Sequence, residues 1–98
     1  MDSGLRDKSV LVTGASGGIG QSIVRVMVEE GAKVAIHYHS GVERAQSLAN
    51  SLPESQVELV GADLTSESDV AGMFDAVTNR FGTVDAVSYT HLTLPTKA

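Results

Sequence analysis

Short apolar runs and longer amphipathic segments alternate along most of the chain. Residues 9–13 centre on the apolar run Val-Leu-Val, which predicts a buried strand. Apolar residues then recur at helical spacing over residues 19–30, namely Ile19, Ile23, Val26 and Met27. This spacing predicts an amphipathic helix. Gly31 follows directly and is suited to end the helix, because glycine readily adopts the left-handed conformation common after a helix C-terminus.

The same alternation is repeated further along the chain. Residues 33–37, with the sequence Lys-Val-Ala-Ile-His, predict a second strand. A second helix is predicted by a further set of apolar residues at helical spacing, which are Val42, Ala45, Leu48, Ala49 and Leu52. Pro53 closes this stripe, because proline cannot continue a helix. Residues 57–60 predict a third strand.

The clearest amphipathic stripe of the chain predicts a third helix. Its members are Val70, Met73, Phe74, Val77 and Phe81. Ser66 and Asp69 have the spacing of a capping pair at the start of this helix, and Gly82 is suited to end it. Residues 84–87 then begin a fourth strand.

Strands that alternate with helices through short connections predict right-handed βαβ units and a parallel sheet. We expect an α/β fold with strand order 3-2-1-4, which is the N-terminal half of a Rossmann-type doubly wound sheet. A fold of this kind binds its ligand across the carboxyl ends of the strands. The candidate site therefore lies where the first strand meets the first helix.

A glycine-rich turn occupies this position, with the sequence Thr-Gly-Ala-Ser-Gly-Gly-Ile-Gly over residues 13–20. The first turn of a helix offers free backbone N–H groups and the positive end of the helix dipole, which together bind phosphate. Gly14 would permit a tight exit from the strand, Gly18 would let a diphosphate approach the backbone, and Gly20 would let the helix pack closely on the sheet. Glycines alone would also suit a flexible turn. A P-loop is disfavoured because no Gly-Lys-Ser/Thr ending follows.

The Thr-Gly-x-x-x-Gly-x-Gly pattern lies between a predicted strand and a predicted helix. With this pattern, the chain resembles the short-chain dehydrogenase/reductase family over about residues 5–86. The resemblance implies an NAD(P)-dependent oxidoreductase that transfers hydride between a nicotinamide coenzyme and a carbonyl or alcohol substrate, such as a 3-oxoacyl thioester or a sugar. It implies that the loop residues Gly14, Ser16, Gly17, Gly18, Ile19 and Gly20 bind the coenzyme. A non-catalytic dinucleotide-binding or sensing module of the same fold is the alternative.

The end of the second predicted strand bears on the choice of coenzyme. An acidic residue about 20 positions after the glycine turn binds the ribose and favours NAD. Here His37 and Tyr38 stand at this place, and no carboxylate is present to repel a 2′-phosphate. We therefore predict NADP, or the use of both coenzymes. The preference is mild, because Gly17 stands where NADP-preferring relatives often carry a basic residue. Arg44 could reach a phosphate, or it could be a solvated surface residue.

Asp63 and Leu64 match the position beside the adenine ring in the family. A carboxylate can accept a hydrogen bond from the exocyclic amine of adenine. The alternative is an aspartate that simply ends a strand before a helix. A metal site is not expected, because His37 and His39 have no third ligand nearby in the sequence.

The family pattern breaks after residue 86, where the family would continue into an Asn-Asn-Ala-Gly segment. Residues 87–96 instead resemble the in-frame translation of a common transposase-type sequencing adapter. We expect residues 1–86 to be the N-terminal part of a truncated NAD(P)-binding domain, and residues 87–98 to be a non-family tail of artefactual origin. A natural short protein is the alternative. The catalytic serine and the Tyr-x-x-x-Lys pair of the family do not occur, so no catalytic residue is assigned.

Composition narrows the classes of partner. The net charge of −5 argues against nucleic-acid and anionic-membrane partners. The chain has no cysteine, which excludes disulfides and thiolate metal sites. We see no signal peptide and no apolar run long enough to cross a membrane, and we expect a cytoplasmic protein. The expected partner is a dinucleotide coenzyme. The untruncated protein from which residues 1–86 would derive is expected to be a homo-oligomer.

Overall fold

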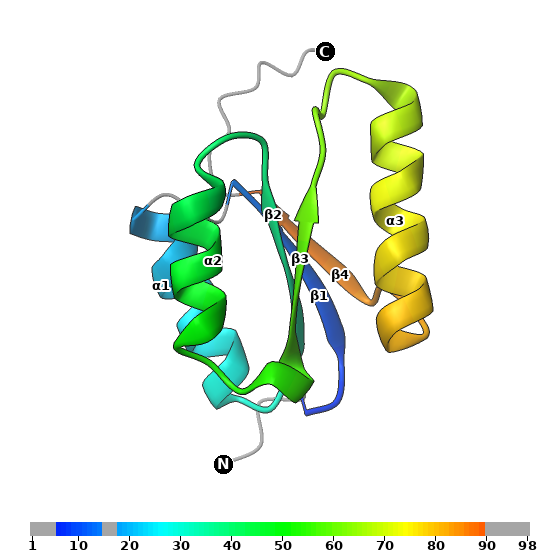
Figure 1. The fold of residues 1–98 in the computed structure, drawn as a ribbon. Coiled ribbons are helices and arrows are strands. Elements are labelled where there is room, and N and C mark those ends of the chain that lie inside the picture. The colour runs from blue at the N-terminus through cyan, green and yellow to red at the C-terminus, as the bar shows by residue number, and fades with distance from the viewer. Residues whose placement is uncertain (1–5, 15–17, 90–98) are drawn as a thin grey trace.

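A computed structural model describes residues 6–14 and 18–89 of the chain (Figure 1). Within them, strands and helices alternate as the sequence predicts. The elements are β1 (Ser9–Thr13), α1 (Gly18–Glu29), β2 (Lys33–Tyr38), α2 (Val42–Asn50), the short 3-10 helix η1 (Glu54–Gln56), β3 (Val57–Gly61), α3 (Glu67–Phe81) and β4 (Ala86–Tyr89). All the strand pairs are parallel, and the strand order is β3-β2-β1-β4. The predicted fold class and strand order are confirmed.

The sheet is covered on both faces, with α1 and α2 on one side and α3 on the other (Figure 1). Strand β1 shows why both faces need cover. Val10 and Val12 belong to the buried cluster beneath α1 and α2, whereas Leu11, between them in the sequence, belongs to the cluster beneath α3. Side chains alternate between the faces of a strand, so a continuous apolar run is buried only when both faces are covered.

Gly31 and Gly82 end helices and Ser66 caps a helix start, as predicted, but the side chain of Asp69 has a different partner. Gly31 and Gly82 both have positive φ, at 93° and 92°. At the start of α3, Ser66 Oγ accepts a hydrogen bond from the Asp69 N–H at 3.3 Å. The Asp69 carboxylate, however, accepts from the Asp63 N–H at 3.0 Å. Asp69 therefore connects α3 to the end of β3 as well as contributing to the cap.

Two element boundaries differ from the prediction. Helix α2 ends at Asn50, before Leu52, because the Ser51 hydroxyl donates to the Leu48 carbonyl at 2.7 Å and terminates the helix. Strand β4 begins at Ala86 opposite Val10 and continues to Tyr89, whereas the sequence predicts a start at residue 84. The preceding residue, Asp85, uses its side chain as well as its backbone to pair with β1, so the regular ladder starts after it.

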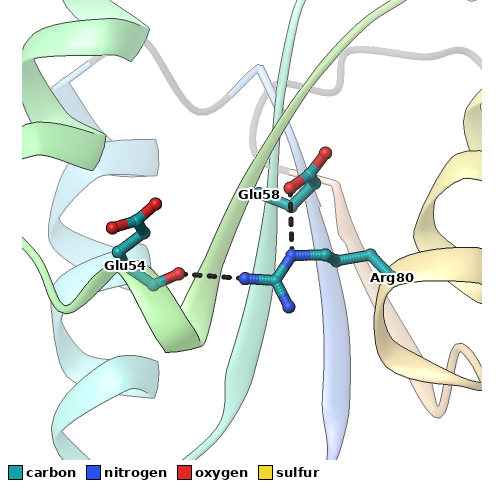
Figure 2. Close-up of polar contacts among 3 residues, drawn as sticks. All are labelled: Glu54, Glu58 and Arg80. Atoms are coloured by element: carbon teal, nitrogen blue, oxygen red, sulfur yellow. Dashed lines mark hydrogen bonds and ion pairs between the residues drawn. The ribbon is translucent and has the colours of Figure 1, made fainter.

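Arg80 joins α3 to the amino-terminal end of β3 (Figure 2). Its Nε lies 3.2 Å from Glu58 Oε1, and its Nη2 donates to the Glu54 carbonyl at 3.1 Å. The Arg80 and Glu58 side chains are both 37% exposed, so solvent screens the pair and its contribution to stability is small. The contact lies at the edge opposite the glycine turn.

Candidate functional site

The carboxyl ends of β1, β2 and β3 meet at one edge of the sheet, which is the upper edge in Figure 1. Gly14 follows β1, Tyr38 is the last residue of β2, and Asp63 follows soon after β3. Parallel pairing therefore brings together three segments that are widely separated in the sequence. His37, from the second segment, contacts Gly14, whereas Asp63 lies one strand further away because β3 pairs with β2, so a ligand that contacts all three segments must span this edge.

The glycines of the turn have different surroundings. Gly14 has a φ of 63°, in the left-handed region that glycine adopts without strain. Gly18 is the first residue of α1 and is exposed, and a Cβ added there would meet no atom of the described residues within 4 Å. Gly20 is buried, which agrees with a close approach between α1 and the sheet. The predicted site residues Ser16 and Gly17 lie outside the described residues.

The beginning of α1 suits an anion. Its first turn contains no acidic residue. A carboxylate there would occupy the positive end of the helix dipole and repel a phosphate. Ile19 is 70% exposed at this end of the helix, so its side chain is available to contact a ligand.

His37 is buried at the carboxyl end of the sheet. It is 2% exposed, and its Nδ1 accepts a hydrogen bond from the Gly14 N–H at 3.0 Å. Its Nε2 lies 2.9 Å from the Ala62 carbonyl oxygen. Both ring nitrogens therefore contact the neighbouring segments of the protein. The sequence reading places His37 beside the ribose, whereas the structure directs its ring into the protein interior.

Tyr38 remains half-buried at the predicted ribose position. Its ring lies over the last residue of β3, since a Cβ added to Gly61 would be 3.0 Å from Tyr38 Cζ and Oη. His39 is exposed in the loop that follows, and Arg44 is exposed on α2. The described residues include no cluster of three or more histidine, aspartate or glutamate residues that could hold a metal ion.

Asp63 is held by a local turn at the predicted adenine position. Its Oδ1 accepts hydrogen bonds from the Thr65 hydroxyl at 2.7 Å and from the Thr65 N–H at 3.0 Å. These bonds hold the pKa of Asp63 below its ordinary value of 3.8, and the nearby His39 lowers this pKa further. The carboxylate is thus ionised at neutral pH and can accept from a ligand through Oδ2. Leu64 beside it is 44% exposed.

Sequence reasoning did not identify the contacts of His37 and Thr65. A histidine that ends an otherwise apolar strand is a signal for the first, because a buried imidazole requires partners. The spacing Asp-x-Thr is a signal for the second, since aspartate commonly accepts from the backbone two residues ahead.

In the part of the chain that the structure describes, no helix has the length and apolar character needed to span a membrane.

Comparisons of sequence and of structure with known proteins both point to one family. The sequence profile of the short chain dehydrogenases matches residues 8–90. An uncharacterized oxidoreductase of Staphylococcus aureus (strain USA300) is 37% identical over 83 residues, which are 85% of this chain and 36% of that protein. The 3-oxoacyl-(acyl-carrier-protein) reductase FabG of Staphylococcus epidermidis is 36% identical over 83 residues, covering 83% of this chain and 34% of that protein.

Among solved structures, a short-chain dehydrogenase/reductase of Brucella melitensis, described as a glucose/ribitol dehydrogenase, superposes with a TM-score of 0.81 at 26% identity. The match covers 89% of this chain and 37% of that one. The chain thus spans about a third of the length of the curated relatives that it matches. The profile match over most of its residues shows that the chain belongs to the short-chain dehydrogenase family.

Proposed function

We propose that this chain forms the coenzyme-binding part of an NAD(P)-dependent oxidoreductase, which transfers hydride between a nicotinamide dinucleotide and a carbonyl or alcohol substrate. Family membership implies the dinucleotide coenzyme. Its relatives include a protein named as a 3-oxoacyl reductase and one described as a sugar dehydrogenase, which supports these two substrate classes. In this proposal the complete protein is the longer polypeptide that carries this chain together with the rest of the family fold.

The surroundings of Gly18 carry the proposal. Gly18 is the first residue of α1, where backbone N–H groups have no partner within the helix, and it places no side chain over them. The described part of the protein has room for a larger residue here, since none of its atoms lies within 4 Å of a Cβ added at Gly18. A ligand that packs against the backbone at this point gives a reason for the absence of a side chain. The diphosphate of a dinucleotide has the size and charge to occupy this position at a helix N-terminus.

The other site residues fit the remaining parts of a dinucleotide. Gly14 and Ile19 flank the diphosphate position, and Tyr38 at the end of β2 would lie toward the adenosine ribose. Asp63 would accept from the exocyclic amine of adenine, with Leu64 against the ring. When bound, the nicotinamide supplies or accepts the hydride. The residues of this chain bind and orient the coenzyme, and the proton-transfer groups would belong to the remainder of the complete protein.

The finer proposal is that NADP binds more tightly than NAD. Residues 37–41 contain no carboxylate. The absence of a carboxylate at this end of β2 removes the repulsion that a 2′-phosphate meets in NAD-specific proteins.

The test is the replacement Gly18→Val in the complete protein, followed by calorimetric titration with NADP and NAD. The added side chain would occupy the space of the diphosphate and should weaken binding by at least ~2 kcal/mol, because charge-assisted hydrogen bonds to the backbone are lost. Gly72→Val is the matched control, since Gly72 also lies in a helix and no atom of the described residues is within 4 Å of an added Cβ. Equal affinity in wild type and Gly18→Val would contradict the proposal.

A further inference from the structure

His37 bridges two segments that the proposed function assigns to different parts of the coenzyme. Strand β2 lies between β1 and β3 in the sheet, and His37 is next to its last residue. The ring accepts from the Gly14 N–H on one side and meets the Ala62 carbonyl on the other. Gly14 opens the glycine turn, and Ala62 immediately precedes Asp63. A single side chain therefore connects the diphosphate and adenine segments.

The two contacts specify one form of the ring. A backbone N–H can only donate and a carbonyl oxygen can only accept. Nδ1 must therefore be unprotonated to accept from Gly14, and Nε2 must carry the hydrogen that is donated to Ala62. The imidazole is neutral and present as the Nε2–H tautomer. His37 is 2% exposed and Ala62 is 5% exposed, so water does not readily replace the contact between them.

We propose that His37 is a positioning residue, which sets the spacing and orientation of Gly14 relative to the Ala62–Asp63 segment before the coenzyme binds. This inference rests on the proposed function of the site. A dinucleotide that spans both segments binds more tightly when their geometry is already established, because binding then costs less ordering of the protein. The Gly14 contact is the decisive one, since Gly14 has the positive φ at which β1 turns toward α1.

A purely structural role predicts a different result from substitution. If His37 served only to fill space, any replacement of similar size would behave alike in coenzyme binding once the protein was folded. If the contact with Gly14 positions the turn, binding depends on whether an acceptor remains at the place of Nδ1. Asparagine carries its amide oxygen near the position of Nδ1, and glutamine carries its amide nitrogen near that of Nε2. His37→Asn can keep the Gly14 contact, and His37→Gln can keep the Ala62 contact.

The experiment compares His37→Asn, His37→Gln and His37→Leu with wild type in the complete protein, by calorimetric titration with NADP and NAD and by thermal unfolding. We expect His37→Asn to bind within about threefold of wild type. His37→Gln and His37→Leu should weaken binding about tenfold or more, the size expected when a partly buried backbone N–H loses this acceptor. Asn79→Leu is the control for loss of a polar side chain, because Asn79 is exposed on α3 beside Arg80, which contacts the amino-terminal end of β3, and it should leave the affinity unchanged.

A second measurement does not depend on the variants folding. The 15N spectrum of wild-type protein labelled in its histidine rings should show His37 as the neutral Nε2–H tautomer at pH 7. The Nδ1–H tautomer or an imidazolium would overturn the inference. Equal affinity in all three folded variants, or equal losses in His37→Asn and His37→Leu, would also overturn it. A wild-type protein that binds neither dinucleotide would instead overturn the proposed function on which the inference rests.

Discussion

Ser9 and Asp85 exchange hydrogen bonds across 76 positions of the sequence. The Asp85 Oδ2 accepts from the Ser9 N–H at 2.8 Å, and the Asp85 N–H donates to the Ser9 carbonyl at 2.8 Å. The pair joins the amino-terminal ends of β1 and β4 and sets the register in which Ala86 lies opposite Val10. Within the described residues, the Ser9 hydroxyl is buried and has no hydrogen-bond partner, so the contribution of Ser9 comes from its backbone.

The first prediction separates these backbone contacts from the hydroxyl. Asp85→Ala should lower the stability of the complete protein by about 1–2 kcal/mol, because the Ser9 N–H loses a charged acceptor. Ser9→Ala should cost less than about 0.5 kcal/mol or should stabilise, since it removes an unpaired hydroxyl. Asp85→Asn retains an acceptor oxygen and should fall between wild type and Asp85→Ala. Thermal unfolding measures all three, and an Asp85→Ala variant as stable as wild type would refute the role of the carboxylate.

The second prediction concerns two glycines with opposite surroundings. A Cβ at Gly61 would be 3.0 Å from Tyr38 Cζ, so Gly61→Ala must displace the tyrosine ring and should lower stability by about 1 kcal/mol. A Cβ at Gly72 in α3 meets nothing within 4 Å. Gly72→Ala should therefore raise stability by about 0.5–1 kcal/mol, because alanine is the better helix former. Unfolding midpoints that shift in the same direction for both variants would contradict this reading.

The third prediction follows from the turn at Asp63. The Thr65 hydroxyl is the main cause of the lowered pKa of the Asp63 carboxyl. Thr65→Val removes this donor and keeps the backbone N–H, so the pKa of Asp63 should rise toward 3.8. Thr65→Ser keeps a hydroxyl and should leave the pKa low. NMR titration of the Asp63 carboxyl would distinguish the two variants, and an unchanged pKa in Thr65→Val would refute the assignment.

The sign of the accompanying pH dependence follows from the direction of this shift. A carboxyl group whose pKa is lower in the folded state than in the unfolded state contributes stability above the unfolded value. That contribution is lost as the pH falls from about 3.8 through the lower, folded pKa. Thr65→Val should therefore be less sensitive than wild type to acid in this range, and Thr65→Ser should behave as wild type does.

The fourth prediction concerns the choice of coenzyme. Tyr38 is the last residue of β2, at the proposed ribose position. Tyr38→Asp should shift the preference of the complete protein toward NAD, because the carboxylate would accept from a ribose hydroxyl and repel a 2′-phosphate. Tyr38→Asn is the control of similar shape without the charge. The ratio of the NADP and NAD dissociation constants is the measurement, and a ratio that does not change in Tyr38→Asp would show that this position does not select the coenzyme.

Local residue patterns were sufficient to predict most of the fold. The continuous apolar run of residues 10–12 is typical of a strand covered on both faces, and the alternation of Val10 and Leu11 between two clusters confirms this. Glycines that must adopt positive φ, such as Gly31 and Gly82, mark helix ends from the sequence alone. The strand order followed from the general handedness of βαβ units and from the resemblance to the family.

Contacts between distant segments were decided by the tertiary structure. Whether His37 faces a ligand or the protein depends on which strands flank β2, and only sheet assembly brings Gly14 and Ala62 to the two sides of its ring. The late start of β4 has the same origin, since Asp85 finds its partner 76 positions away. The spacing of apolar residues along a segment indicates which of its side chains are buried. Hydrogen bonds of a buried polar group depend on the direction of donors and acceptors, which exist only after the segments have packed.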